Sequence, residues 1–269
     1  MTHVIILAGG KGRRLNSERE GPKVLRKVGG KPIILRILQS IRPICSDPTI
    51  VVGYGADQVM AATGGRYHYV HQEQQLGTGH AVRCAVHELA ARHDIQNIIV
   101  VNGDHPFIST EMLRRLVIER ESTDAPIAMA TIVVPDFEGD RAGLSGFGRV
   151  VRDAAGRVRA IVELKDADPE TRRIREVNPN YYCFKPAWLW DHINKITNTN
   201  AAGEFYITDL VGIAAAEGGR VGAFPIADYQ EGMGVNTIEE LVAAEACARD
   251  RDAKAGASQI GNGGGLTER

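Results

Sequence analysis

Residues 3–25, HVIILAGGKGRRLNSEREGPKVL, place an apolar strand directly before a loop that is rich in glycine and basic residues. The stretch holds four glycines, three arginines and two lysines. It is too polar after residue 8 for a core segment and too rich in glycine for a helix. Glycine lets backbone amides approach a ligand closely, and consecutive amides form a concave anion site. The stretch therefore predicts a strand that ends in an anion-binding loop.

Two common glycine loops do not fit this stretch. A dinucleotide-binding turn needs a third glycine at position 15, where the chain has Leu15. A Walker-type phosphate loop needs Gly-Lys-Ser/Thr at the start of a helix, and neither GGKGRR nor GGKPII provides it. From this stretch alone, a plain glycine turn with solvated basic residues remains the alternative.

Strand-like and helix-like segments alternate through the first half of the chain. We expect strands at 49–53, 67–71, 97–102 and 126–134, and helices at 31–41, 79–93 and 109–121. Near-continuous apolar strands between helices predict an α/β fold whose parallel sheet is covered on both faces. Ligands of such sheets bind outside the carboxyl ends of the strands. The loop at 9–22 and the turn at 102–104 both fall there.

The second half predicts a smaller β lobe over the mouth of this sheet. Residues 146–166, GFGRVVRDAAGRVRAIVELKD, form two strands around an Ala-Ala-Gly turn. A further strand is expected at 181–184, followed by helices at 186–196 and 204–218. We place one domain over 1–248, with the lobe at about 136–236. A helix begins near Thr237, and the tail at 249–269 is expected to be disordered because its end is small, polar and glycine-rich.

Composition excludes several classes of protein. The net charge of the 269 residues is -1, from 32 basic and 33 acidic residues, so no global field attracts nucleic acid. The longest apolar runs are too short to span a bilayer, and no signal peptide is recognisable. The four cysteines lack metal-type spacing, which indicates reduced, buried thiols. We expect a cytoplasmic protein with neither nucleic acid nor membrane as a partner. Its oligomeric state is left open.

A second candidate site is HQEQQLGTGHAV, residues 71–82. A strand ends near His71, the chain turns through glycines, and a helix begins. The free amides of Gly77 and Thr78 can bond a flat polar edge or a phosphate. Gln72 offers one acceptor and two donors, enough to read a base, although it could equally be a surface amide. His80 is interpreted as an ordinary helix-face histidine.

The third is VVNGDHP, residues 100–106. Asp104 follows an apolar strand, where the ligand of the sheet is expected. One carboxylate together with phosphate oxygens commonly holds Mg²⁺ in proteins. A turn-forming aspartate is the alternative.

Together, in this order, these stretches resemble the sugar-phosphate nucleotidylyltransferase family. The family signature L-x-x-G-x-G-T-R-[ML], a short gap and then P-K is similar to LAGGKGRRL followed by PKVL. EQQLGTGHA, GRV…IVELKDA and GVN also match, over roughly residues 3–247. Within the family, the chain resembles the uridylyltransferase domains that make UDP-N-acetylglucosamine. The resemblance implies a Rossmann-like, mixed but mainly parallel sheet of the nucleotide-diphospho-sugar transferase type, with a sugar-binding lobe.

The resemblance also implies roles for particular residues. The catalytic residues that hold the phosphates would be Arg14 and Lys23. The nucleotide would be bound by Leu7, Ala8, Gly9, Gly10, Gln72, Gly77, Thr78 and Gly103. The sugar would be bound by Asn102, Gly148, Glu163 and Asn178. The cofactor Mg²⁺ would be held by Asp104 and Asn236.

Some positions depart from the family pattern. Arg13 replaces the usual threonine, the gap before Pro22 is about two residues longer, and GVNTIEEL lacks an arginine two places after the asparagine. Asn102 stands where an aromatic residue is common, and Pro179-Asn180 replaces Thr-Gly beside the expected N-acetyl pocket. The departures therefore bear more on the identity of the bound sugar than on the type of reaction.

The expected reaction transfers a uridylyl group from UTP to a sugar 1-phosphate, with N-acetylglucosamine 1-phosphate as the first choice, and releases pyrophosphate. No acetyltransferase activity is expected, because the tail lacks the regularly spaced aliphatic residues of a β-helix. Three alternatives stay open. They are transfer from UTP or dTTP to glucose 1-phosphate, a cytidylyl- or guanylyltransferase acting on a non-sugar phosphate, and a non-catalytic sugar-nucleotide sensor.

Overall fold

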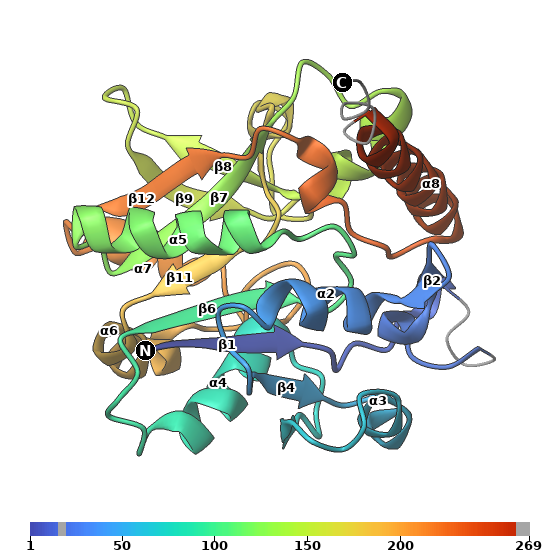
Figure 1. Cartoon of the computed structure of the whole chain (residues 1–269). Coiled ribbons are helices and arrows are strands. Elements are labelled where there is room, and N and C mark those ends of the chain that lie inside the picture. Colours follow the sequence, from blue (N-terminus) through green and yellow to red (C-terminus); the bar gives the residue numbers. More distant parts are fainter. Residues whose placement is uncertain (16–19, 262–269) are drawn as a thin grey trace, which may run out of the picture.

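A ten-stranded mixed sheet runs through the protein (Figure 1). The computed structural model describes residues 1–15 and 20–261. The strand order is β5-β4-β1-β6-β11-β7-β10-β8-β9, with β12 beside β7. The bounds are β1 Thr2–Leu7, β4 Thr49–Val52, β5 His68–His71, β6 Asn97–Asn102, β7 Ile127–Val133, β8 Gly148–Arg152, β9 Val158–Val162, β10 Glu176–Asn178, β11 Tyr182–Phe184 and β12 Val221–Pro225. A separate hairpin joins β2, Lys27–Val28, to β3, Lys31–Pro32.

The parallel part of the sheet confirms the predicted fold class. Strands β5, β4, β1 and β6 all run in one direction. In register, Leu7 at the end of β1 lies beside Asn102 at the end of β6, and also beside Val51 in β4. The loops that follow these strands therefore leave the sheet at one edge.

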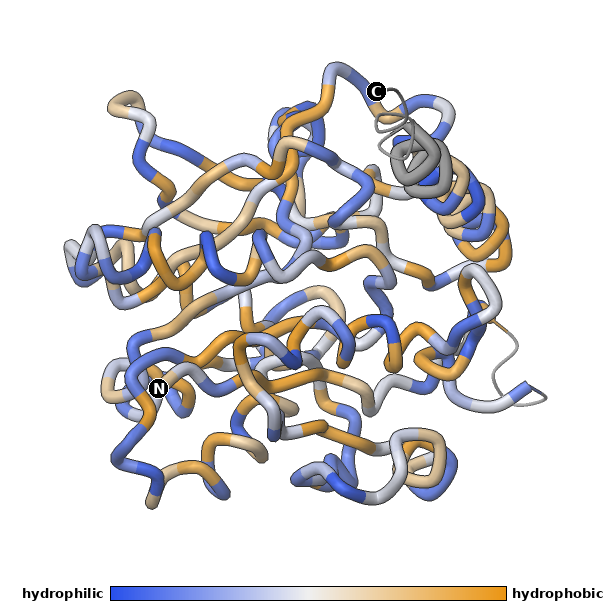
Figure 2. Tube along the Cα trace, in the orientation of Figure 1, coloured by the Kyte–Doolittle hydropathy of each residue, from blue (hydrophilic) through white to orange (hydrophobic). Residues whose placement is uncertain are grey.

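Alternating side chains of β1 divide the core into two layers. Val4 and Ile6 face one hydrophobic cluster, and Ile5 faces the other. The first cluster is covered by α2 (Ile33–Ile41), α5 (Thr110–Thr123) and α8 (Ile238–Gly261), and the second by α4 (Thr78–Leu89), α6 (Pro186–His192) and α7 (Asp209–Ala216). Figure 2 shows hydrophobic residues following the central strands, as expected for a sheet buried on both faces.

The β lobe is smaller than the range that we expected for it. Strands β8, β9 and β10 form it, and Val177 of β10 joins it to Ile132 near the end of β7. Strands β11 and β12, which also lie within 136–236, belong to the central sheet. The reason is burial: Tyr182, Cys183 and Phe184 are fully buried and contribute to the two core clusters.

Three elements differ from the sequence expectations. The short helix α3 (Ala56–Ala62) and strand β12 were not expected. Helix α8 continues to Gly261, beyond the helical pattern that the sequence shows at 238–254, so residues 249–261 of the predicted disordered tail are helical. Its alanines and charged residues are strong helix formers. Residues 262–269 lie outside the described part of the chain.

Candidate active site

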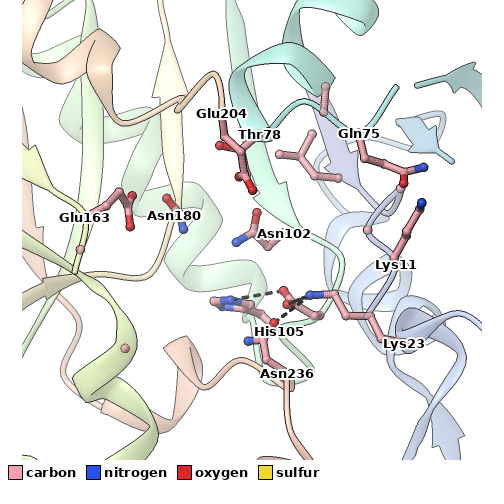
Figure 3. A pocket seen from close by; sticks show the side chains of 18 of the residues that line it. Lys11, Lys23, Gln75, Thr78, Asn102, His105, Glu163, Asn180, Glu204 and Asn236 are labelled. Carbon is pink, nitrogen blue, oxygen red and sulfur yellow. Dashed lines mark hydrogen bonds and ion pairs between the residues drawn. The ribbon is translucent and has the colours of Figure 1, made fainter. Parts of the chain in front are cut away.

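A cavity of about 800 Å³ opens at the carboxyl ends of the parallel strands (Figure 3). All but three of the predicted site residues line it: Leu7, Gly9, Gly10, Arg14, Lys23, Gln72, Gly77, Thr78, Asn102, Asp104, Gly148, Glu163 and Asn236. The other three, Ala8, Gly103 and Asn178, are buried beside it. The cavity has the size of a small-molecule site, and its walls come from both the sheet and the lobe.

The floor of the cavity requires glycine at two positions. The amide of Gly103 donates to the carbonyl of Leu7 at 2.8 Å, and a Cβ at 103 would lie 2.8 Å from that oxygen. A Cβ at Gly9 would lie 3.2 Å from Oε1 of Gln72 and 3.3 Å from the amide nitrogen of Gly53. These close approaches leave no room for a side chain at position 103 and little room at position 9.

Lys23 connects the two predicted metal ligands. Its ammonium forms an ion pair with Oδ2 of Asp104 and donates a hydrogen bond to Oδ1 of Asn236 at 2.9 Å. A backbone bond of 2.9 Å from the Val235 amide to the Asp104 carbonyl holds the two loops together. Burial raises the pKa of Asp104, but the Lys23 ammonium, the neighbouring His105 and the hydrogen bonds to the carboxylate together outweigh it and keep this pKa below its ordinary value.

The donor atoms at this junction suit a hard divalent cation. Oδ1 of Asp104 is buried and accepts no hydrogen bond from the described residues, although Nε2 of His105 lies 3.4 Å from it. Asn236 contributes an amide oxygen. Carboxylate and amide oxygens are the ligands that Mg²⁺ takes from proteins. The described residues contain no group of three His, Cys, Asp or Glu that could hold a metal, so an ion here would need further oxygens from a bound ligand.

Gln72 directly follows strand β5, six residues before α4 begins, and is 5% exposed. Its Nε2 donates to the carbonyl of Gly77 at 3.0 Å and lies 3.1 Å from Nδ1 of His80. Gly77 has a φ of 111°, and a Cβ there would lie 2.6 Å from the carbonyl oxygen of Phe205, so glycine is required. Thr78 is the first residue of the helix, and its amide therefore has no partner within it.

Glu163 and Gly148 form the wall on the lobe side of the cavity. Figure 3 shows Glu163 and Asn180 opposite Lys11 and Lys23. Burial raises the pKa of Glu163, and a 3.1 Å hydrogen bond donated by Thr208 partly offsets this. A Cβ at Gly148 would lie 3.3 Å from the carboxylate oxygens of Glu163.

Asn178 does not reach the cavity, contrary to our expectation. It is 1% exposed, and its Nδ2 donates to Oδ1 of Asn180 at 2.8 Å and to the hydroxyl of Tyr182 at 2.7 Å. Asn180 lines the cavity instead, with a left-handed φ of 60°. Asn178 thus supports the residue that faces the ligand space.

The family of the chain follows from comparison with known sequences. Residues 4–205 match the family described as the MobA-like NTP transferase domain. The chain belongs to this family. The predicted resemblance to nucleotidyltransferases is thereby confirmed.

Several relatives of this NTP transferase are named bifunctional protein GlmU. The proteins from Heliobacterium modesticaldum and Geobacillus thermodenitrificans are each 38% identical to it, over 92% and 93% of this chain. The protein from Limosilactobacillus reuteri is 39% identical over 93% of this chain. In each case the match covers 52% of the relative, so the chain spans about half the length of the curated relatives it matches.

A solved structure shares the fold. It is a putative glucose-1-phosphate thymidylyltransferase from Bacillus anthracis in complex with a sucrose, with a TM-score of 0.70 and 19% identity. The alignment covers 93% of this chain and 96% of the other. None of the helices in the described part of the NTP transferase is long and apolar enough to cross a bilayer.

Sequence reasoning missed part of the cavity of this NTP transferase. The additional lining residues are Lys11, Gln75, Ala81, His105, Gly146, Phe147, Lys165, Asn180 and Glu204. Lys11 and Gln75 lie within stretches that we had singled out as candidate sites. Their position in these stretches could have identified them as cavity residues. Glu204 reaches the cavity from the loop before α7, and its local sequence carries no motif that announces it.

Proposed function

We propose that the protein transfers a uridylyl group from UTP to a sugar 1-phosphate and releases pyrophosphate, and that N-acetylglucosamine 1-phosphate is the preferred sugar. The observation that carries this proposal is the junction of Lys23, Asp104 and Asn236 inside a cavity whose opposite wall holds Glu163. A cationic side chain beside two oxygen ligands suits a triphosphate with its metal. The similarity to proteins named GlmU supports the choice of sugar.

The base would bind at the start of α4. Uracil presents a carbonyl, an N–H and a second carbonyl along one edge. Oε1 of Gln72 can accept from the N–H, and the amides of Gly77 and Thr78 can donate to a carbonyl oxygen. A site built to hydrogen-bond one edge rejects a mismatched one, because buried polar groups are then left unpaired.

The reaction forms one P–O bond and breaks another. An oxygen of the sugar phosphate attacks the α-phosphorus of UTP, and the bond from this phosphorus to the bridging oxygen breaks, so pyrophosphate leaves with the electron pair. The sugar phosphate is already an anion at neutral pH, so no general base is needed. Lys23 and Arg14 supply positive charge near the phosphates, and positioning and charge stabilisation account for most of the catalysis. Asp104 and Asn236 would hold Mg²⁺, which neutralises phosphate charge when bound.

The sugar would lie against the lobe. A buried carboxylate such as Glu163 accepts hydrogen bonds from ring hydroxyls. Asn180 offers its side-chain NH₂ group as a donor, because its Oδ1 already accepts from Asn178 and Tyr182. Asn180 stands at the position where the chain departs from the family pattern. Specificity for the substituent at carbon 2 of the sugar is therefore the property that most needs an experimental test.

Pyrophosphate release from a panel of substrates tests the proposal. UTP, dTTP and CTP are each combined with N-acetylglucosamine 1-phosphate, glucosamine 1-phosphate and glucose 1-phosphate in the presence of Mg²⁺. We expect the highest kcat/KM for UTP with N-acetylglucosamine 1-phosphate. Faster turnover of glucose 1-phosphate would contradict the sugar assignment, and binding of a UDP-sugar without any turnover would indicate a sensor.

A further inference from the structure

The side-chain amide of Gln72 can adopt only one orientation in this structure. Nε2 lies 3.0 Å from the carbonyl oxygen of Gly77, and a backbone carbonyl can only accept. The amide nitrogen must therefore face Gly77. Its second contact, at 3.1 Å, is Nδ1 of His80. Because an amide nitrogen only donates, this ring nitrogen must accept, and the neutral imidazole carries its proton on Nε2.

This orientation turns the amide oxygen toward the glycine loop. A Cβ on Gly9 would lie 3.2 Å from Oε1 of Gln72, and both residues line the cavity. The group presented to a bound base is thus an acceptor, and both N–H groups of the amide are used behind it. Uracil and thymine have an N–H at ring position 3, whereas cytosine has a bare nitrogen there.

The surroundings of His80 favour its neutral form. Burial lowers the pKa of His80, and the nearby Arg83 guanidinium lowers it further. The ring of Phe205 lies 6.4 Å away between centroids, and Sγ of Cys84 lies 4.0 Å from Nδ1. His80 is half-buried and does not itself line the cavity.

We propose that His80 is a positioning residue that selects the base: by accepting from Gln72, it holds the amide oxygen toward the cavity and so favours UTP over CTP. This inference deepens the proposed function and rests on it. Without an acceptor at position 80, the amide can turn by half a rotation and present its NH₂ group to the bare ring nitrogen of cytosine. The carbonyl of Gly77 still disfavours that rotation, so part of the selectivity remains.

Substitutions at position 80 test the proposal through the ratio of two substrates. His80→Leu removes the acceptor, and His80→Asn keeps an oxygen near the place of Nδ1. We expect the ratio of kcat/KM for UTP to that for CTP to fall about 10-fold in His80→Leu, the effect of one hydrogen bond. His80→Asn should stay within about 3-fold of the wild type. His87→Leu, the same change at an exposed position of the same helix, is the matched control and should leave the ratio unchanged.

The ratio separates positioning from mere packing. A loosened pocket would lower turnover of both nucleotides equally, so an unchanged ratio in His80→Leu overturns the inference. The protonation of His80 is a second readout that needs no variant activity. Long-range ¹H–¹⁵N NMR of the wild type, assigned with His80→Asn, should show the proton on Nε2, and a proton on Nδ1 would overturn the inference. A wild type that does not prefer UTP would count against the proposed function. The NMR measurement would still test the hydrogen bond from Gln72 to His80 independently.

Discussion

Lys23 is joined to two residues that lie far from it in the sequence, Asp104 and Asn236, so its substitution should have two separable effects. Lys23→Ala should reduce kcat about 100- to 1000-fold, because one charge-stabilising contact contributes ~2.7–4 kcal/mol to a transition state. It should also lower the free energy of unfolding by about 1–3 kcal/mol, because the buried carboxylate of Asp104 loses its partner. Steady-state kinetics and urea unfolding measure the two.

The double variant Lys23→Ala/Asp104→Asn is the control for this prediction. An amide is cheaper to bury unpaired than a carboxylate, so stability should recover while turnover stays low. Normal turnover in a folded Lys23→Ala protein would remove Lys23 from the mechanism.

Glu163 should make the stability of the protein depend on pH. Its pKa is raised by burial, so the folded state holds the proton more tightly than the unfolded state. The folded protein therefore loses stability as the pH rises above the ordinary pKa of glutamate and through the raised one. Glu163→Gln removes this loss. The melting temperature of Glu163→Gln relative to wild type should rise between pH 4 and pH 8, while exposed Glu88→Gln should show no such trend.

The same variant should bind the sugar less well. A hydrogen bond to a charged group contributes about 1.5–3 kcal/mol, so kcat/KM for the sugar phosphate should fall about 10- to 100-fold. A variant that is more stable at pH 8 but turns over normally would show that Glu163 is buried for another reason.

Residues within motifs were easier to predict than their partners. Lys23, Gln72 and Asp104 follow from local patterns next to strand ends, and the structure brings all three to one cavity. We expected Asn178 in the cavity, but it is buried. An asparagine at the end of a strand gives no sign that Asn180, in the turn that follows, adopts a left-handed conformation. His80 carries no local sign of its contact with Gln72, which depends on how the turn before α4 folds back.

Helix α5 begins where the sequence predicts, and its cap offers a test at the scale of an element. Oγ of Ser109 accepts from the amide of Met112 at 3.0 Å. The same hydroxyl donates to Oε2 of Glu231 at 3.0 Å. Ser109→Ala removes both bonds and should lower the free energy of unfolding by about 1–2 kcal/mol. For a protein of this size each kcal/mol corresponds to about 2–4 °C in the melting temperature. Ser122→Ala, at the exposed far end of the same helix, should change it by less than about 0.5 kcal/mol.

Helices and strands with a clear pattern of apolar residues were predictable from the sequence, and short elements were not. Helix α2 has isoleucine and leucine along one buried face, and β6 has an unbroken apolar run at 98–101. Helix α3 has only seven residues and starts after Gly55 in a left-handed conformation, and β12 contains a glycine and ends on a proline. Strand β12 forms because β7 offers it a parallel edge, and such pairing depends on residues nearly a hundred positions away.

At the scale of the whole molecule, α8 contacts and holds in place the segments that contain Lys23, Asp104 and Asn236. The helix starts at Ile238, two residues after Asn236, whose amide donates to Oε2 of Glu240 at 2.6 Å. Glu245 accepts from the amide of Gly29, in the hairpin that follows Lys23, at 3.1 Å. Local sequence patterns do not reveal this arrangement, because Gly29 and Glu245 lie 216 positions apart in the chain.

Truncation measures what the later turns of α8 contribute. Arg251 forms an ion pair of 2.6 Å with Asp228 and stacks 4.8 Å from the ring centre of Phe107, three residues after Asp104. A chain ending at residue 253 should melt at the same temperature as the full chain. A chain ending at residue 248 loses both contacts. Its free energy of unfolding should fall by about 1 kcal/mol, because a partly exposed ion pair contributes about 0.2–1 kcal/mol and the contact of Arg251 with the buried ring of Phe107 about 0.5–1 kcal/mol. Its kcat should also fall several-fold, since Phe107 and Asp104 share one loop. Arg251→Ala in the full chain should reproduce most of the loss, and Arg249→Ala, at an exposed arginine two residues earlier, should not. Equal stability and turnover of the two truncated chains would mean that the folded unit ends at residue 248, as the sequence first indicated.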